Sequence, residues 1–141
     1  MSPSSFMLEI ADALIWLAMK DYDILAVCAH AALETGWGQS TLFLDGKNLF
    51  GIKGEGIEFK TIEYIDGKPQ VLIDKFKKYD SYVDCAKDYD RIIREHYPIT
   101  YKFRDKAAVY FLALAKEGWA TDPMYFQKLL WVYDYLLKGG S

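Results

Sequence analysis

Apolar residues recur three and four positions apart over much of this chain, which is the spacing of helices that bury one face. The first such stretch begins at Ser4 or Ser5, runs to about Lys20 and is apolar on nearly every side. It therefore predicts a helix near the centre of the molecule. A second stretch predicts a helix that begins after Asp21 or Asp23, because aspartate is a favourable N-cap.

The middle of the chain changes to short runs rich in apolar and β-branched residues, which is the pattern of strands. Residues 57–65 and 70–77 flank Asp66-Gly67, and this dipeptide between two such runs is typical of a tight hairpin turn. Pro69 falls at the start of the second strand, where a missing N–H is tolerated. A loop rich in glycine, aspartate and asparagine is expected before the hairpin, over 44–56.

Helical spacing returns after the hairpin and continues towards the C-terminus. The expected helices run from Ser81, with Asp84 in a capping box, to just before Pro98, from Asp105 to Gly118, and from Asp122-Pro123 through Tyr133. No repeat or low-complexity linker interrupts the chain, so one domain over 1–141 is expected, mostly helical with a single hairpin. Gly139-Gly140-Ser141 has the composition of a linker or tag remnant.

The composition suits a domain that folds without disulfides or metal. A chain of 141 residues with 52% hydrophobic residues can bury an adequate core. Cys28 and Cys85 have no metal-ligand spacing around them, so buried free thiols, no metal site and no cofactor are expected. The net charge of −3 argues against binding nucleic acid, which requires clustered cations. The aromatic content of 16% fits either a core or a platform for a ligand.

The first apolar stretch predicts neither a signal peptide nor a membrane span. It follows no basic segment, contains Glu9 and Asp12, and is too short to cross a bilayer. An export route other than a signal in this chain is therefore expected, if the protein acts outside the cell.

Residues 31–38 (AALETGWG) carry the most unusual chemistry in the sequence. They place Glu34 in the last turn of an apolar helix that should stop at Gly36-Trp37-Gly38. A negative charge is disfavoured at a helix C-terminus, and apolar neighbours add a desolvation cost. Both effects raise a carboxyl pKa, which suits a general acid near neutral pH. His30 lies on the same helical face, where a structural role is the commoner one.

Four segments in this order resemble the β-N-acetylglucosaminidases of glycoside hydrolase family 73, which cleave bacterial peptidoglycan. They are AALETGWG at 31–38, NLFGIKG at 48–54, the Phe76 and Tyr79-Asp80-Ser81 stretch, and WATDPMY at 119–125. The resemblance covers residues from about 6 to 137 and implies a lysozyme-like fold, with the hairpin as a lobe flanking the active-site cleft.

The resemblance also implies roles for individual residues. Glu34 occupies the position of the catalytic general acid, and Glu63 that of a second functional glutamate on the hairpin. Trp119 stands where the family usually has a tyrosine, and an indole keeps a stacking face but cannot handle a phenolic proton. The residues expected to bind the glycan are Trp37, Asn48, Phe50, Gly51, Tyr64, Trp119 and Tyr125.

The expected reaction is hydrolysis of the β-1,4 bond between N-acetylglucosamine and N-acetylmuramic acid. Glu63 would serve as a base or a nucleophile, or the substrate's acetamido group would act in its place. The alternatives are a lytic transglycosylase or muramidase on the same scaffold, or an inactive wall-binding module. A monomer acting at the bacterial cell wall is expected, either a phage endolysin released by a partner protein or one domain of a longer secreted protein.

Overall fold

The computed structural model describes residues 1–140, and Ser141, the last residue of the expected linker remnant, lies outside the described residues. Helices and one two-stranded antiparallel sheet make up the described part of the chain. In chain order the elements are α1 (Pro3–Glu9), α2 (Ala11–Ala18), α3 (Ile24–Thr35), α4 (Thr41–Gly46), β1 (Gly56–Ile65), β2 (Lys68–Lys77), α5 (Tyr82–His96), α6 (Pro98–Lys102), α7 (Ala107–Lys116) and α8 (Tyr125–Leu137). The expected α+β class with one hairpin is confirmed.

The helix predicted at the N-terminus is two helices. The backbone leaves helical geometry at Ile10, which separates α1 from α2, and Ser2 rather than Ser4 or Ser5 caps α1. Its expected central position is also wrong, because Ile15 is 53% exposed and the central helix is α3. Four alanines and one cysteine lie in the twelve residues of α3, and such small side chains let neighbouring helices pack closely around it.

The hairpin forms as the alternating pattern predicts. Strands β1 and β2 pair antiparallel, with Ile65 opposite Lys68 next to the turn. Asp66 and Gly67 both adopt positive φ, of 52° and 76°, as a two-residue type I′ turn requires. Pro69 lies opposite Tyr64 near this turn, at the second position of β2.

Side-chain caps explain where some helices begin. The Asp23 carboxylate accepts from the N–H of Ala26, and Ser81 Oγ accepts from the N–H of Asp84, both as expected. Asp122 also accepts a backbone N–H, that of Met124, but helical geometry begins only at Tyr125. A turn over 123–124 therefore separates this cap from α8.

Three segments differ from the sequence prediction. Helix α7 begins at Ala107 without a side-chain cap, so Asp105 does not open it. Helices α4 and α6 are short and were not predicted, because five or six residues carry too little periodicity to reveal a helix. Helix α4 overlaps the start of the loop expected over 44–56.

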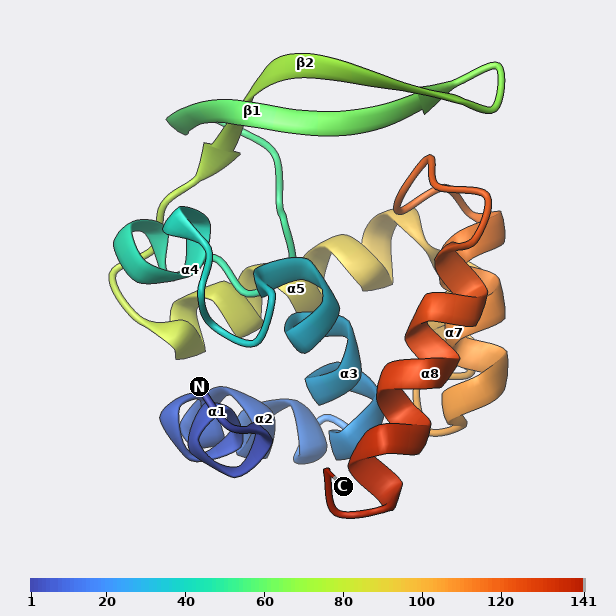
Figure 1. Cartoon of the computed structure of the whole chain (residues 1–141). Coiled ribbons are helices and arrows are strands. Elements are labelled where there is room, and N and C mark those ends of the chain that lie inside the picture. The colour runs from blue at the N-terminus through green and yellow to red at the C-terminus, as the bar shows by residue number, and fades with distance from the viewer. Residues whose placement is uncertain (141) are drawn as a thin grey trace.

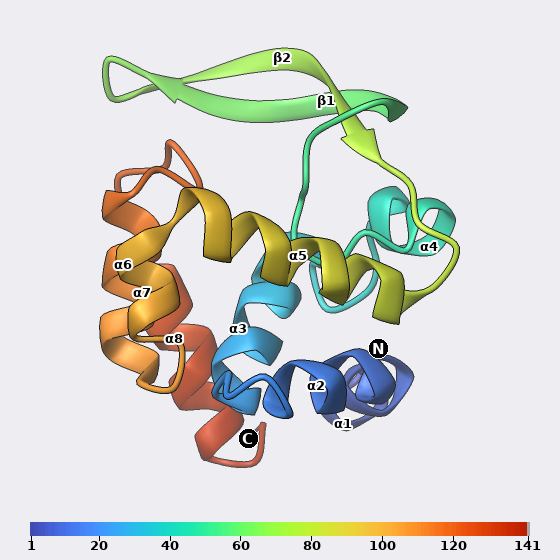
Figure 2. The same cartoon turned by 180° about the vertical axis from the view of Figure 1, so that it is seen from behind.

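The hairpin crosses one end of the helical body, as the opposite views in Figures 1 and 2 show. In the helical body, α3 packs against α8 and α2, and α2 packs against α5. The turn end of the hairpin reaches over the segment that joins α7 to α8 (Figure 1). This arrangement brings the end of α3, the hairpin and the α7–α8 segment together, although they are far apart in sequence.

Candidate active site

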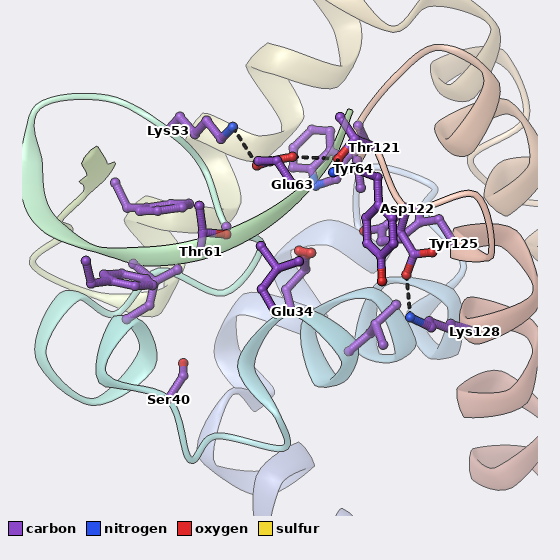
Figure 3. Close-up of a pocket in the computed structure, with 18 residues that line it drawn as sticks. Glu34, Ser40, Lys53, Thr61, Glu63, Tyr64, Thr121, Asp122, Tyr125 and Lys128 are labelled. Carbon is purple, nitrogen blue, oxygen red and sulfur yellow. Dashed lines mark hydrogen bonds and ion pairs between the residues drawn. The ribbon is translucent and has the colours of Figure 1, made fainter. Parts of the chain in front are cut away.

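A pocket of about 360 Å³ lies between the hairpin and the helical body. Its walls come from the end of α3, from the segment before β1, from the strands, and from the α7–α8 segment with the start of α8 (Figure 3). The residues that line it are Leu33, Glu34, Ser40, Leu42, Gly51, Lys53, Phe59, Thr61, Ile62, Glu63, Tyr64, Phe76, Trp119, Ala120, Thr121, Asp122, Tyr125 and Lys128.

Glu34 occupies the last turn of α3, and Gly36 ends the helix in the left-handed conformation at φ 58° and ψ 46°. The Glu34 side chain points into the pocket, towards the hairpin (Figure 3). Burial raises its pKa to about 7, and the negative charge of Glu63 adds to this rise. The nearby hydroxyl group of Tyr125 and the charge of Lys53 lower the same pKa. Near neutral pH the carboxyl group is therefore poised to donate a proton.

Gly51 allows the Glu34 carboxyl group to lie against the backbone. Its φ is +69°, and a Cβ at this position would come within 3.1 Å of Glu34 Oε2. Glycine adopts this backbone conformation at no steric cost and leaves space for the carboxylate. Position 51 is therefore one where a side chain would disturb the acid directly.

Glu63 is held by partners on both oxygens. Its Oε1 accepts from Lys53 Nζ at 3.0 Å, and its Oε2 accepts from Thr121 Oγ1 at 2.6 Å (Figure 3). The Thr121 hydrogen bond lowers the pKa of Glu63, and Lys53 acts in the same direction, whereas burial and the charge of Asp74 oppose them. Glu63 is therefore ionised at pH values at which Glu34 is still protonated. Opposite pKa shifts of this kind distinguish a general acid from a carboxylate that stays charged.

Tyr125 and Trp119 form the wall nearest the end of α3. The Tyr125 hydroxyl is buried and makes no hydrogen bond of ordinary geometry, yet it lies close enough to Glu34 to lower that residue's pKa. The indole N–H of Trp119 donates to the carbonyl oxygen of Phe50 at 3.2 Å. The donor of Trp119 is therefore engaged, and its ring remains as a half-buried face of the pocket.

The structure brings together six of the residues singled out by sequence. Glu34, Glu63, Gly51, Tyr64, Trp119 and Tyr125 all line the pocket. The other three, Trp37, Asn48 and Phe50, do not line it.

Those three residues have structural contacts instead. Asn48 is fully buried and donates to the carbonyl oxygens of Ile52 and Lys77, both at 2.9 Å. It therefore connects the segment before β1 to the end of β2. Phe50 is also fully buried and stacks on Tyr89 with ring centroids 3.8 Å apart, so it offers no face to a glycan. Trp37 packs edge-on against Phe6 and Tyr135, outside the pocket.

Several pocket residues were not identified from the sequence. Phe59 and Phe76 stack across the hairpin at 4.6 Å and present an aromatic surface on the face that carries Glu63. Period-2 counting from Glu63 was the available signal for Phe59. Thr121 lies within the segment WATDPMY but nothing local distinguishes its role, because its partners are on the hairpin.

The described residues include no group of three or more His, Cys, Asp or Glu side chains arranged to hold a metal ion. Cys28 and Cys85 are buried and free, and burial raises the pKa of each thiol to about 12. No helix within residues 1–140 has the length and apolar character needed to cross a bilayer.

Curated relatives share much of this sequence. The Vibrio parahaemolyticus peptidoglycan hydrolase FlgJ is 33% identical over 115 residues, covering 74% of this chain and 37% of that protein. The Enterococcus faecalis autolysin is 34% identical, covering 99% of this chain and 22% of that protein. The chain thus spans well under half the length of these relatives.

Solved structures share the fold. A mutant peptidoglycan hydrolase from Sphingomonas sp. A1 superimposes with a TM-score of 0.84 at 31% identity, covering 96% of each chain. The catalytic domain of the Listeria monocytogenes autolysin Auto has a TM-score of 0.75 at 28% identity, covering 99% of this chain and 87% of that one. The glucosaminidase family model, described as mannosyl-glycoprotein endo-beta-N-acetylglucosaminidase, matches residues 13–137. The chain therefore belongs to the glucosaminidase family of glycoside hydrolases, family 73, and has its lysozyme-like fold.

Proposed function

We propose that this chain hydrolyses the β-1,4 bond between N-acetylglucosamine and N-acetylmuramic acid in peptidoglycan, with Glu34 as the general acid. The observation that carries the proposal is the pair of carboxyl groups in one pocket, one with a pKa raised to about 7 and one with a lowered pKa. The names of the relatives, peptidoglycan hydrolase and autolysin, support the choice of substrate.

The two carboxyl groups have separate roles in glycoside hydrolysis. Protonated Glu34 gives its proton to the glycosidic oxygen as the bond from that oxygen to the anomeric carbon breaks. Ionised Glu63 stabilises the positive charge that develops on the sugar, and takes a proton from the water that completes hydrolysis. In the competing substrate-assisted route, the sugar's acetamido oxygen attacks the anomeric carbon as the glycosidic bond breaks, water then opens the cyclic intermediate, and Glu63 acts only by its charge.

Aromatic faces and hydrogen bonds hold the substrate in this proposal, since the chain as a whole carries a net charge of −3. The half-buried rings of Trp119 and Phe59 both line the pocket, one from the helical body and one from the hairpin. Sugar rings stack on such faces through their apolar C–H surfaces. A muramic acid carboxylate near Lys53 or Lys128 would meet cations that are already paired with acidic side chains.

The biological setting follows from the substrate. We infer that the chain is a single glucosaminidase domain that acts as a monomer at the bacterial cell wall. It reaches the wall as a released phage endolysin or as one domain of a longer secreted protein.

Product analysis tests the reaction. Purified peptidoglycan is digested with wild-type protein, with Glu34→Gln, and with the control Glu58→Gln, whose carboxylate is exposed on the other face of β1. Fragments with reducing-end N-acetylglucosamine from the wild type and the control, and none from Glu34→Gln, are expected by mass spectrometry. Reducing muramic ends or 1,6-anhydro-muramic ends would instead identify a muramidase or a lytic transglycosylase.

The substitution at position 119 bears on whether the chain is active at all. The Trp119 N–H is engaged by Phe50, and an indole does not accept a hydrogen bond, so the proposed reaction has no proton transfer at this residue. Binding to cell walls without release of soluble sugar would favour the inactive wall-binding module instead.

A further inference from the structure

Thr121 connects the α7–α8 segment to the hairpin through one hydroxyl group. Its Oγ1 accepts from the backbone N–H of Tyr64 at 2.8 Å and donates to Oε2 of Glu63 at 2.6 Å. These partners are 57 and 58 positions away in the sequence. The same atom therefore contacts both the edge of β1 and the carboxylate proposed to stay charged.

The direction of these hydrogen bonds is determined by the chemistry of the partners. A backbone N–H can only donate, so the Thr121 oxygen accepts from Tyr64. An ionised carboxylate can only accept, so the Thr121 hydrogen is directed to Glu63. Serine and threonine combine these two capacities in a short side chain, whereas valine, of the same shape as threonine, has neither.

Pairing within the hairpin leaves the Tyr64 N–H available. Ile65 and Lys68 close the two-residue turn as a hydrogen-bonded pair, and such pairs alternate with non-hydrogen-bonded ones along an antiparallel hairpin, so the next pair, Tyr64 and Pro69, is of the second kind. The Tyr64 N–H instead points to the free edge of β1, where Thr121 accepts it. The register of the hairpin thus leaves a donor at the point where β1 meets the helical body, and Pro69 is tolerated opposite it because this pair needs no N–H from position 69.

We propose that Thr121 is a positioning residue that fixes Glu63 over the pocket and fastens the hairpin edge to the helical body. This inference rests on the proposed function, in which Glu63 acts as the charged carboxylate. Thr121 itself exchanges no proton with substrate, and acts through the orientation of Glu63.

The charged groups around Glu63 explain why Thr121 is needed beside Lys53. Lys53 Nζ contacts Asp74 at 3.0 Å as well as Glu63, and its side chain is half exposed. Besides Lys53 and Asp74, Glu34 on α3 is the third charged group that interacts with Glu63. Lys53 is shared between two carboxylates and orients Glu63 weakly, whereas the Thr121 hydroxyl donates its one hydrogen to Glu63 alone, at 2.6 Å.

Two variants at position 121 test the proposal. Thr121→Val keeps the shape and removes the hydroxyl, and Thr121→Ser restores the hydroxyl as the matched control. We expect Thr121→Val to lower kcat by about tenfold to a hundredfold, as for loss of a hydrogen bond to a charged group, with KM changed less than about threefold. We expect Thr121→Ser to recover most of kcat. The acidic limb of the pH–rate profile should move to higher pH in Thr121→Val alone.

Measurements without substrate separate this proposal from the proposed function. NMR titration of the Glu63 carboxyl carbon should show a higher pKa in Thr121→Val than in the wild type and Thr121→Ser. Hydrogen exchange at the Tyr64 amide should be faster in Thr121→Val at an unchanged melting temperature. An unchanged Glu63 titration and Tyr64 exchange would overturn the proposal, and so would equal losses of kcat in both variants. A wild-type protein that releases no glycan would refute the proposed function, while the NMR measurements would still decide the role of Thr121.

Discussion

Burial and the negative end of the α3 dipole both disfavour the ionised form of Glu34, so the negative charge of this residue destabilises the folded state. The folded-state pKa of about 7 lies above the ordinary value of 4.5, so the folded protein binds this proton more tightly than the unfolded chain. The stabilisation linked to this proton is fully present below about pH 4.5 and is lost as pH rises to about 7. The loss has an upper limit of roughly 3 kcal/mol.

Replacing Glu34 with glutamine should therefore change stability in a pH-dependent way, because glutamine does not ionise. We expect the free energy of unfolding of Glu34→Gln, relative to the wild type, to increase between pH 5 and pH 8 by about 1–3 kcal/mol. Urea denaturation at the two pH values measures this difference. A difference independent of pH would contradict the raised pKa of Glu34.

Gly51 offers a second prediction at the scale of one residue. Gly51→Ala places a methyl group about 3.1 Å from Glu34 Oε2 and a side chain at φ +69°. We expect the activity to fall at least tenfold, because displacement of the acid from the scissile oxygen costs rate steeply. The melting temperature should fall by only a few degrees, since the backbone strain is about 1 kcal/mol.

Gly67→Ala is the matched control for this substitution. Gly67 has a similar φ of +76°, but a Cβ there meets nothing within 4 Å. Gly67→Ala should lower the melting temperature as much as Gly51→Ala does, but should keep the wild-type activity on peptidoglycan. Equal activity in both variants would show that the contact with Glu34 does not matter.

At the scale of elements, the hairpin depends on the helical body for its stability. Its outer face exposes Val71 and Ile73, at 67% and 71%, so little apolar area is buried there. Its inner face is supported by the stacked rings of Phe59 and Phe76. A two-stranded sheet with so little burial is marginal by itself.

We therefore expect the hairpin to open at a lower free energy cost than the core helices. Hydrogen exchange followed by mass spectrometry should show faster exchange in peptides of β1 and β2 than in peptides of α3 and α5. When the protease digestion yields separate peptides for β1, β2, α3 and α5, their exchange rates can be compared within one sample. Equal protection of strands and helices would mean that the hairpin and the helical body open as one unit.

At the scale of the whole molecule, activity depends on two carboxyl groups that belong to different parts of the fold. Glu34 comes from the helical body and Glu63 from the hairpin, and the acid must be protonated while the other stays ionised. Activity should therefore fall as pH rises through the Glu34 pKa of about 7, and again as pH falls through the lowered pKa of Glu63.

A bell-shaped profile of kcat/KM against pH on soluble peptidoglycan fragments is the expected result. Glu63→Gln should lower the rate and abolish the acidic limb, while the alkaline limb remains. A profile that stays flat from pH 5 to pH 9 would exclude this division of roles.

The sequence by itself determined the features that depend on neighbours along the chain. The hairpin turn follows from Asp66-Gly67 between two strand patterns, and the Ser81 cap follows from its spacing to Asp84. The placement of Glu34 in the last turn of an apolar helix was visible for the same reason. The ordered segments around these residues were sufficient to predict the family and the fold.

Only the tertiary structure decided how distant segments meet. Asn48 and Phe50 belong to a segment with a family resemblance, but contacts with β2 and α5 bury them away from the pocket. Thr121 has no local pattern that predicts its contact with Glu63, because the two residues are 58 positions apart. The opposite pKa shifts of Glu34 and Glu63 likewise depend on burial and on charges from several elements, which spacing along a chain does not encode.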